Sequence, residues 1–304
     1  MQVPYQGLLV SIVIPTYNRA YCLDRAVQSV LNQTYSKWEL IIIDNHSSDN
    51  TDTLVNGYQD PRIILYKIHN NGIIAASRNM GIMKAKGELL AFLDSDDWWV
   101  ENKLQSSVNK INSGADLVYH DLITSSKLNE SSLFYKTFMT NKFNKTRQVE
   151  FPVFEDLLYF GNAITTSSVV VKKDKLKLVG GFSENESLIS GEDYDLWLRI
   201  SKNRDCKFER ICQPLGYYWM GEDNTSSADR NITSLREILN RYNIKNKIPG
   251  WACYVLGRAY YKLGNTSLSR KYLSMAIYKD NSWTVRIKAL ITLFFNIFQK
   301  KVKF

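Results

Sequence analysis

Three aspartates follow directly on a short apolar run in the first third of the chain. The run is residues 89–93, and the acids are Asp94, Asp96 and Asp97. Carboxylates this close repel one another unless a cation offsets their charge. Mg²⁺ typically binds one or two carboxylates together with the phosphate oxygens of a substrate. The cluster therefore predicts a metal site at Asp94 and Asp96 that holds a diphosphate, whereas Asp97 is expected to be the N-cap of a helix beginning near Val100.

Polar and aromatic residues also follow two earlier apolar runs. After the first run, Thr16 and Tyr17 stand where Tyr17 could stack on a nucleotide base, or where it could be a turn residue packed on the next helix. After the second run, Asp44 could accept hydrogen bonds from a uracil-type imide or a ribose hydroxyl, or it could cap the following helix. The residues alone leave both pairs of alternatives open.

One cation and a second acidic pair complete the candidate chemistry. Arg78 could neutralise a phosphate or pair with Asp94, although as an exposed salt bridge it would contribute little. Glu192 and Asp193 stand at the start of an amphipathic helical segment. Acids favour helix N-termini because of the helix macrodipole, so these two residues by themselves leave a structural role open.

The elements that must position these residues alternate between strand and helix. Short apolar runs at residues 8–14, 38–43, 62–66, 88–93 and 116–119 are separated by helical-period segments at 20–31, 51–59, 73–85 and 100–112. This alternation predicts an α/β fold with a parallel sheet and helices on both faces. Asp49 and Asn50 precede the second helix, and Gly87 is expected to close the third. Ligands of such sheets bind at the carboxyl ends of the strands, where the candidate residues stand.

The second half of the chain differs from the first in composition and in its expected secondary structure. Residues 124–148 are polar and basic, which fits an acceptor-binding loop or a plain surface excursion equally well. A strand-like run follows at 165–171, and we place a domain boundary near residue 227. Residues 228–304 are predicted to be all-helical, and 251–265 resembles one tetratricopeptide-type helix hairpin. A single hairpin is too short for a free solenoid, so it must pack on something else.

Composition narrows the class of partner. The 304 residues carry a formal charge of +9, which suggests an acidic partner such as a phosphorylated substrate or anionic lipid. Nucleic-acid binding is not expected, because the basic residues form no recognisable motif. Four scattered cysteines predict reduced thiols in a cytoplasmic protein, and neither a signal peptide nor a membrane-spanning segment is expected. The three histidines have no ligand spacing.

The polar blocks occur together in a characteristic order. They are residues 13–19, 43–49, 78–82, 85–88, 92–97, 179–182 and 191–197. In this order and spacing they resemble the inverting family 2 glycosyltransferases of the GT-A fold. The resemblance covers roughly residues 8–227, implying a GT-A domain at 1–227, with its acceptor-side half from about residue 122, and a separate helical extension at 228–304. It also implies a Rossmann-like, mostly parallel sheet.

The resemblance assigns a role to each block. It implies a nucleotide-diphospho-sugar donor, most often a UDP-sugar, bound by Pro15, Thr16, Tyr17, Asp44, Asn45, Arg78, Asp94 and Ser95. Asp96 would hold Mg²⁺ or Mn²⁺, and Asp94 would orient the ribose or the metal shell. Asp193 would take the proton from an acceptor hydroxyl, with Glu192 as the fallback base. The acceptor would be a glycan or a lipid-linked glycan of a bacterial cell-envelope polysaccharide pathway.

Two positions depart from the family pattern. Asn45 stands where the second acid of the nucleotide block is often Asp. Tyr218 and Met220 occupy the places where many relatives carry an Arg and a His. A thioether is a poor ligand for a hard cation, so metal or phosphate contacts from this loop are expected to be weakened or absent.

The C-terminal segment combines basic residues with an apolar stretch. Residues 281–304 contain five basic and no acidic residues, which flank the apolar stretch 289–298. This pattern fits a helix lying in an anionic membrane interface, at the inner face of the cell membrane. It fits equally a last helix packed on the preceding hairpin, with a solvated basic end.

Two rival functions remain to be weighed. A non-catalytic, nucleotide-sugar-binding scaffold would have no need for Asp94, Asp96 and Asp193 together. A nucleotidyltransferase would need a Gly-rich, basic loop for a nucleoside triphosphate, and residues 15–20 contain no glycine. The glycosyltransferase interpretation is therefore preferred, with the scaffold as the alternative.

Overall fold

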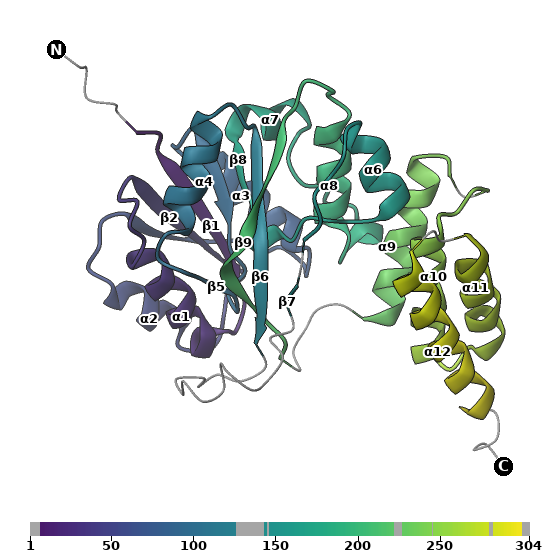
Figure 1. Cartoon of the computed structure of the whole chain (residues 1–304). Helices are drawn as coiled ribbons and strands as arrows, with labels where there is room; N and C mark the ends of the chain where they lie inside the picture. Colours follow the sequence, from purple (N-terminus) through teal and green to yellow (C-terminus); the bar gives the residue numbers. More distant parts are fainter. Residues whose placement is uncertain are drawn as a thin grey trace, which may run out of the picture.

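The computed structural model describes residues 7–125, 143–144, 146–221, 227–244, 246–279 and 282–299. Its first half alternates strands and helices, as expected (Figure 1). The elements are β1 (Val10–Thr16), α1 (Ala20–Leu31), β2 (Trp38–Asp44), α2 (Thr51–Gly57), β3 (Ile63–Lys67), α3 (Ile74–Lys84), β4 (Leu89–Phe92), β5 (Trp98–Trp99) and α4 (Lys103–Asn112). The sequence therefore positions the first four strands through helical crossovers, which bring their carboxyl ends to one edge.

The sheet combines a parallel half with a mixed half. Its remaining strands are β6 (Leu117–Ser125), β7 (Phe143–Asn144), β8 (Val170–Lys172) and β9 (Phe208–Trp219), in the order β3-β2-β1-β4-β8-β6-β9-β5, with β7 beside β6. The parallel pairing predicted from the alternation holds from β3 to β4 and again between β6 and β9. β8 inserts between β4 and β6 and runs antiparallel to both. β8 therefore interrupts the parallel order of the sheet between β4 and β6.

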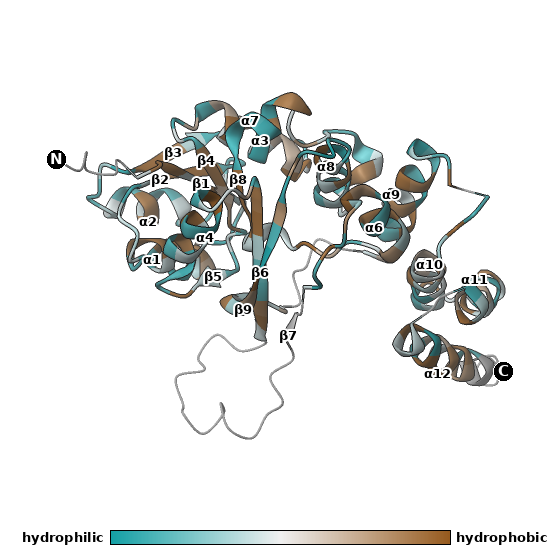
Figure 2. Cartoon of the chain, turned by 45° about the horizontal axis from the view of Figure 1, so that its top comes forward, coloured by the Kyte–Doolittle hydropathy of each residue, from teal (hydrophilic) through white to brown (hydrophobic). Residues whose placement is uncertain are grey.

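Alternating residues of the central strands build two separate cores. Ile12, Ile14 and Leu40 pack on one face, under α1, α2 and α4. Val13 and Ile41 pack on the other face, under α3 and the later helices. Successive side chains of a strand point to opposite faces, so a fully apolar strand needs cover on both sides. The hydrophobic strands lie between these helices in Figure 2.

The connection after β6 contains short helices in place of part of the expected strand. The elements here are α6 (Val153–Phe160), the 3₁₀ helix η1 (Thr166–Ser168), α7 (Lys173–Leu178), the 3₁₀ helix η2 (Glu186–Leu188) and α8 (Glu192–Ser201). The strand expected at 165–171 is therefore reduced to β8, because η1 takes up its first half. Most of the basic segment at 124–148 lies outside the described residues.

Gly87 does not close the third helix as expected. α3 ends at Lys84, and a Cβ added at Gly87 would lie 2.5 Å from the carbonyl oxygen of Leu9. The amide of Gly87 also donates to Ser11 Oγ at 2.8 Å. Gly87 is thus required by the close approach of β1 rather than by a helix end.

The C-terminal segment is helical, as predicted. It comprises α9 (Ala228–Arg241), α10 (Gly250–Lys262), α11 (Thr266–Lys279) and α12 (Trp283–Gln299). α10 and α11 form a hairpin that turns at Gly264, whose φ is +72°. The large core that contains Trp197 also takes in Ile232, Ile238 and Leu256 from α9 and α10. The domain boundary near residue 227 stays a prediction. Among the described residues, no helix is both long and apolar enough to cross a membrane.

Candidate active site

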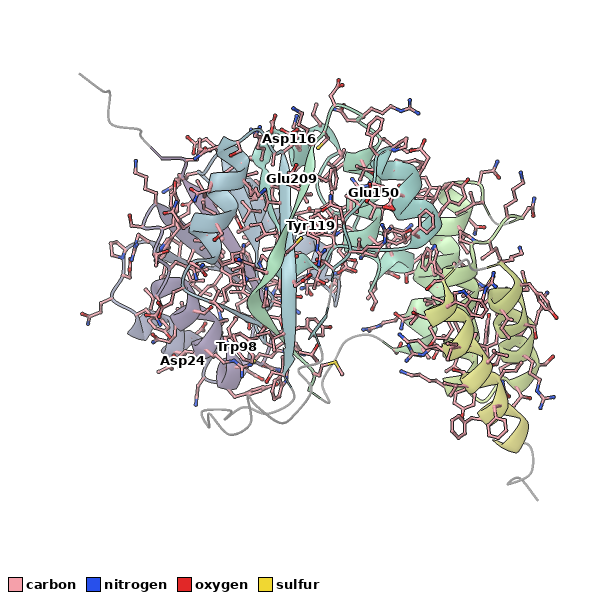
Figure 3. The ribbon with its side chains drawn as sticks, viewed as in Figure 1. Asp24, Trp98, Asp116, Tyr119, Glu150 and Glu209 are labelled. Atoms are coloured by element: carbon pink, nitrogen blue, oxygen red, sulfur yellow. The ribbon has the colours of Figure 1, made fainter. Side chains whose placement is uncertain are left out.

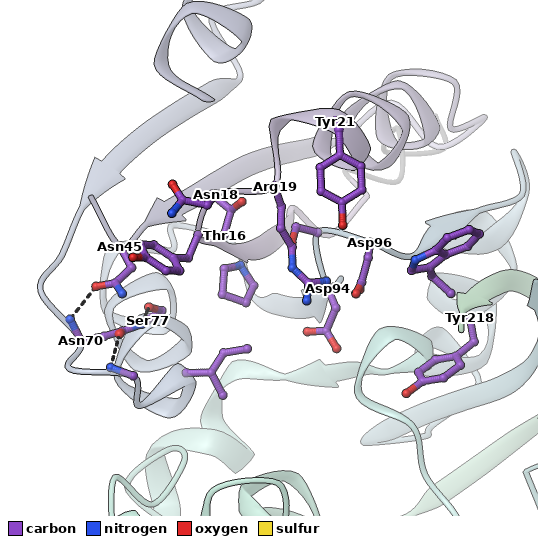
Figure 4. Close-up of a pocket in the computed structure, with 16 residues that line it drawn as sticks. Thr16, Asn18, Arg19, Tyr21, Asn45, Asn70, Ser77, Asp94, Asp96 and Tyr218 are labelled. Carbon is purple, nitrogen blue, oxygen red and sulfur yellow. Dashed lines mark hydrogen bonds and ion pairs between the residues drawn. The ribbon is translucent and has the colours of Figure 1, made fainter. Parts of the chain in front are cut away.

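A cavity of about 450 Å³ opens at the carboxyl ends of β1, β2 and β4 (Figure 4). It is lined by Pro15, Thr16, Tyr17, Asn18, Arg19, Tyr21, Asn45, Asn70, Gly72, Ile74, Ser77, Asp94, Ser95, Asp96, Tyr218 and Trp219. Of the residues predicted to bind the donor or metal, the structure brings seven together here: Pro15, Thr16, Tyr17, Asn45, Asp94, Ser95 and Asp96. The strand-end motifs therefore converge on one space of the size that small ligands occupy.

Asp44 lies behind this cavity rather than in its wall. Its carboxylate is fully buried, accepts a hydrogen bond from Lys67 Nζ at 2.6 Å and accepts the amide of Ser47 at 3.1 Å. It does not cap α2 either, because the carboxylate of Asp49 accepts the amide of Thr51 at 3.1 Å. Asp44 thus fixes the turn after β2 with its carboxylate buried, and its contact with a base stays a prediction.

Asn45 organises the wall of the cavity through a chain of amides. Its Oδ1 accepts the amide of Asn70 at 2.9 Å, and Asn70 Nδ2 donates to Ser77 Oγ at 2.8 Å (Figure 4). The sequence does not predict Asn70 and Ser77 as site residues, because neither belongs to a block with a recognisable pattern. An Asp at position 45 could also accept the Asn70 amide, so the Asn45 departure preserves this local arrangement.

Each of the two candidate metal-binding carboxylates is paired with an arginine. Arg19 forms an ion pair with Asp96, and Arg78 Nη2 donates to Asp94 Oδ1 at 2.7 Å. Burial, followed by the nearby charge of Asp94, raises the pKa of Asp96. Arg78 is itself buried, so the exposed salt bridge considered from the sequence does not describe it.

The loop that carries the aspartates is fixed from behind by a stacked arginine. Arg25 Nη2 donates to the carbonyl oxygen of Asp96 at 2.8 Å. Its guanidinium lies 3.6 Å from the ring centroid of Trp98, and Trp98 stacks on Tyr217 at 4.7 Å. Figure 3 labels Trp98 at the end of the sheet beside α1. A stacked, bonded arginine restricts the backbone of Asp96 and so holds the carboxylates in place.

Asp97 is not the N-cap that the sequence predicted. α4 begins at Lys103, and Asn102 precedes it. Asp97 is buried instead, and its Oδ1 accepts the amide of Trp219 at 2.8 Å. Burial, with the charges of Asp96 and Asp94, raises its pKa well above the usual value. Asp97 therefore ties the end of β9 to the aspartate loop.

A second cavity of about 210 Å³ adjoins the first. Asp94, Tyr218, Gly72 and Ile74 line both, and the second also contains Arg78, Thr165, Thr166, Ile189, Ser190, Glu192, Asp193 and Arg230. Arg78 connects the two, because its Nη1 donates to Glu192 Oε1 at 2.7 Å while its other nitrogen binds Asp94. The acids predicted for metal and base therefore flank one continuous cleft.

Asp193 has the environment of a carboxylate with an unusual proton affinity. Its Oδ2 accepts a hydrogen bond from Thr166 Oγ1 at 3.2 Å, and Asn162 Nδ2 lies 3.5 Å away. Burial, followed by the adjacent charge of Glu192, raises the pKa of Asp193 to about 6. A pKa in this range suits a group that accepts a proton near neutral pH.

The two departures in the block after β9 differ in their placement. Tyr218 lines both cavities, whereas Met220 is exposed and lines neither. Burial raises the pKa of Tyr218, so its hydroxyl stays protonated and can donate a hydrogen bond. Residues 222–226 lie outside the described part of the chain.

The residues present fit a hard divalent cation. Asp94 and Asp96 both line the larger cavity. In the described part of the chain, no group of three or more His, Cys, Asp and Glu is arranged to hold a metal. A cation here would therefore take these carboxylates and complete its coordination with substrate oxygens, as Mg²⁺ commonly does.

The fold agrees with that of solved glycosyltransferases. Residues 1–349 of TarS from S. aureus, solved with UDP-GlcNAc, match with a TM-score of 0.61 and 15% identity, over 95% of this chain and 89% of that one. The mannosyltransferase PcManGT from Pyrobaculum calidifontis, solved with GDP-Man and Mn²⁺, gives a TM-score of 0.57 at 14% identity, covering 98% and 89%. At this identity the match supports the α/β GT-A fold alone.

Some proteins of known sequence are more similar to this chain than these solved structures are. The Escherichia coli protein WfaP, named a UDP-Glc:alpha-D-GlcNAc-diphosphoundecaprenol beta-1,3-glucosyltransferase, is 33% identical over 63% of this chain and 70% of its own length. WfgD of the same organism, with the same named activity, is 43% identical, but over 33% of this chain and 40% of its own. The family model described as glycosyl transferase family 2 matches residues 11–165, about half of the chain. The protein therefore belongs to glycosyl transferase family 2.

Proposed function

We propose that the protein transfers a sugar, with inversion, from a UDP-sugar to a hydroxyl of a lipid-linked glycan. The observation that carries this proposal is the shared wall of the two cavities. The larger holds the paired carboxylates Asp94 and Asp96, and the smaller holds Asp193. A transferase needs two adjoining sites of this kind, because donor and acceptor must meet with their reacting atoms close together.

The larger cavity would take the donor. Tyr17 is 55% exposed at its rim and offers a ring face on which a base can stack. Arg19 lines this cavity and could contact phosphate oxygens as well as the carboxylate of Asp96 with which it now pairs. A bound Mg²⁺ or Mn²⁺, held by Asp94 and Asp96, would stabilise the charge that develops on the departing diphosphate.

The smaller cavity would take the acceptor sugar. Asp193 accepts the proton of the acceptor hydroxyl as that oxygen bonds to the anomeric carbon. The bond from the anomeric carbon to the UDP oxygen breaks on the opposite side, and UDP leaves with the electron pair. Thr166 orients the carboxylate of Asp193, and Arg78 holds Glu192 beside it. Glu192 would be the base only if Asp193 proved dispensable.

The acceptor class rests on relatives and on charge. WfaP and WfgD are named for acceptors that carry a diphosphate next to the sugar. In this protein Arg230 lines the smaller cavity from α9, and its side chain is exposed at the mouth. An acceptor with its sugar beside Asp193 would place its diphosphate near this guanidinium. The reaction would then occur at the cytoplasmic face of the cell membrane, in cell-envelope polysaccharide synthesis.

Calorimetry tests the donor site directly. UDP, dTDP and GDP would be titrated with and without Mn²⁺ into the wild type, Asp96→Asn, and the control Asp174→Asn on α7, whose acid is exposed and lines neither cavity. We expect Mn²⁺-dependent binding of UDP that Asp96→Asn weakens by about tenfold or more, equivalent to ~1.4 kcal/mol, with no change in the control. A folded protein that binds none of the three nucleotides would favour the scaffold alternative.

A further inference from the structure

The last helix of the described chain exposes an unusual row of large apolar side chains. They are Trp283, Ile287, Leu290, Ile291, Phe294 and Phe295 on α12, and each is at least half exposed. At about 100° per residue, the six fall within an arc of about 140°. We refer to them as the α12 stripe. Scattered exposed apolar residues are ordinary, but a continuous row of this kind marks a contact surface.

The opposite side of α12 is firmly attached to the protein. Ala289 is fully buried with Leu273 and Cys253, which come from α11 and α10. Asn296 is also buried, and its Nδ2 donates to Ser269 Oγ at 2.7 Å. Ser269 Oγ in turn donates to the carbonyl oxygen of Gly257 at 2.9 Å. This three-helix contact fixes the rotation of α12, so the α12 stripe faces away from the hairpin.

Basic residues border the stripe, and acidic residues are absent from the helix. On the helical wheel Arg286 and Lys288 lie on either side of the arc, and residues 282–304 contain no Asp or Glu. Lys300, Lys301 and Lys303 follow in the sequence, outside the described residues. Figure 1 places α12 at the end of the molecule farthest from β1–β3, and Figure 2 shows its hydrophobic residues. Long basic side chains beside an apolar face can reach anionic headgroups while the face enters the acyl region.

We propose that the α12 stripe lies in the interface of an anionic membrane, with α12 parallel to the bilayer plane. The inference deepens the proposed function, since a lipid-linked acceptor is presented at that surface. The 17-residue helix is about 25 Å long, which suits it to lie along a membrane. Charge favours lipid over a second copy of the chain, because two copies would bring their own basic borders together.

Vesicle flotation tests this without donor or acceptor, so its failure is distinguishable from failure of the transferase proposal. The full chain would be mixed with vesicles of equal parts phosphatidylcholine and phosphatidylglycerol, or of phosphatidylcholine alone, at low and physiological salt. We expect wild type to float with the anionic vesicles only. Ile287→Ser/Phe294→Ser should reduce the bound fraction by about tenfold or more, because two apolar side chains no longer leave water. Arg286→Gln/Lys288→Gln should weaken binding most at low salt.

A matched control variant tests whether the loss of binding is specific to the α12 stripe. Met83→Ser/Leu178→Ser removes two exposed apolar side chains from α3 and α7, away from the stripe, and should float like wild type. Circular dichroism of each variant would verify that the helices remain folded. The proposal is overturned if wild type fails to float at low salt, or if it binds both vesicle types equally. It is also overturned if light scattering shows a dimer that the stripe variant alone converts to a monomer.

Discussion

The proton affinity of Asp193 gives a sharp prediction for the pH dependence of catalysis. Its pKa is raised from the ordinary 3.8 to about 6, chiefly by burial and then by the charge of Glu192. A raised pKa means that the proton is retained to higher pH, so the base form is lost as the pH falls through 6. At pH 5 about one tenth of Asp193 would be ionised, and kcat/KM should fall about tenfold below its plateau.

The assay would follow UDP release in the presence of acceptor between about pH 4.5 and about pH 8.5, a range whose ends are set by protein stability. The profile of kcat/KM should show one acid limb with an apparent pKa of about 6. Asp193→Asn should lose about 10²–10⁴-fold in kcat, the range that general bases supply. Donor binding should remain, because Asp193 lines only the smaller cavity.

Glu192→Gln separates the two candidate bases. Removing the charge of Glu192 removes one cause of the raised pKa, so the acid limb should move to lower pH with the plateau largely retained. Arg78 would keep its bond to Asp94 in this variant. A variant that is inactive at every pH, together with an active Asp193→Asn, would assign the base to Glu192. A wild-type profile that stays flat to about pH 4.5 would refute the environment described for Asp193.

Two further predictions concern a glycine pair and the acceptor side. Gly180 and Gly181 have nearly equal φ values of +75° and +73°, but only at Gly181 would a Cβ meet a neighbour, at 2.6 Å from Asn79 Oδ1. Gly180→Ala should lower the free energy of unfolding by about 1 kcal/mol, because alanine is strained at a positive φ. Gly181→Ala should lower it by more, because its Cβ would also clash with Asn79. Urea denaturation of both variants would measure the losses, and equal losses would contradict the steric argument. Arg230→Gln should raise the KM for a diphosphate-linked acceptor by about threefold to tenfold and leave the KM for UDP-sugar unchanged, with exposed Arg204→Gln as the control. An equal effect on an uncharged alkyl glycoside would argue against a phosphate contact.

The sequence predicted the parts of the site that depend on local order. Asp94 and Asp96 come directly after a buried strand, and the structure places both in the larger cavity. Asp193 is the second residue of α8, and the structure places it in the adjoining cavity. Nearby residues determine where a strand ends and where a helix starts, so the sequence predicts these positions without knowledge of the fold.

The predictions that failed depend on partners far away in the chain. Asp97 looked like a helix cap, but it binds the amide of Trp219, 122 residues later. Asp44 was a candidate cap of the second helix, but its carboxylate pairs with Lys67 from the neighbouring strand. The antiparallel insertion of β8 likewise depends on which strands meet, and no local period encodes that choice.

The contact between α9 and the start of α8 has a consequence for how the chain can be divided. A Cβ added at Gly191 would lie 3.0 Å from Ser234 Cβ, so α9 rests directly on the residue before Glu192. Arg241 Nη1 on the same helix donates to the fully buried carboxylate of Asp195 at 2.7 Å. The helix that carries the two acids proposed for catalysis is therefore packed against residues well beyond the stretch that the family model matches. A chain truncated before α9 would leave the buried carboxylate of Asp195 without its partner Arg241, so we expect it to lose the positioning of α8 as well as the C-terminal helices.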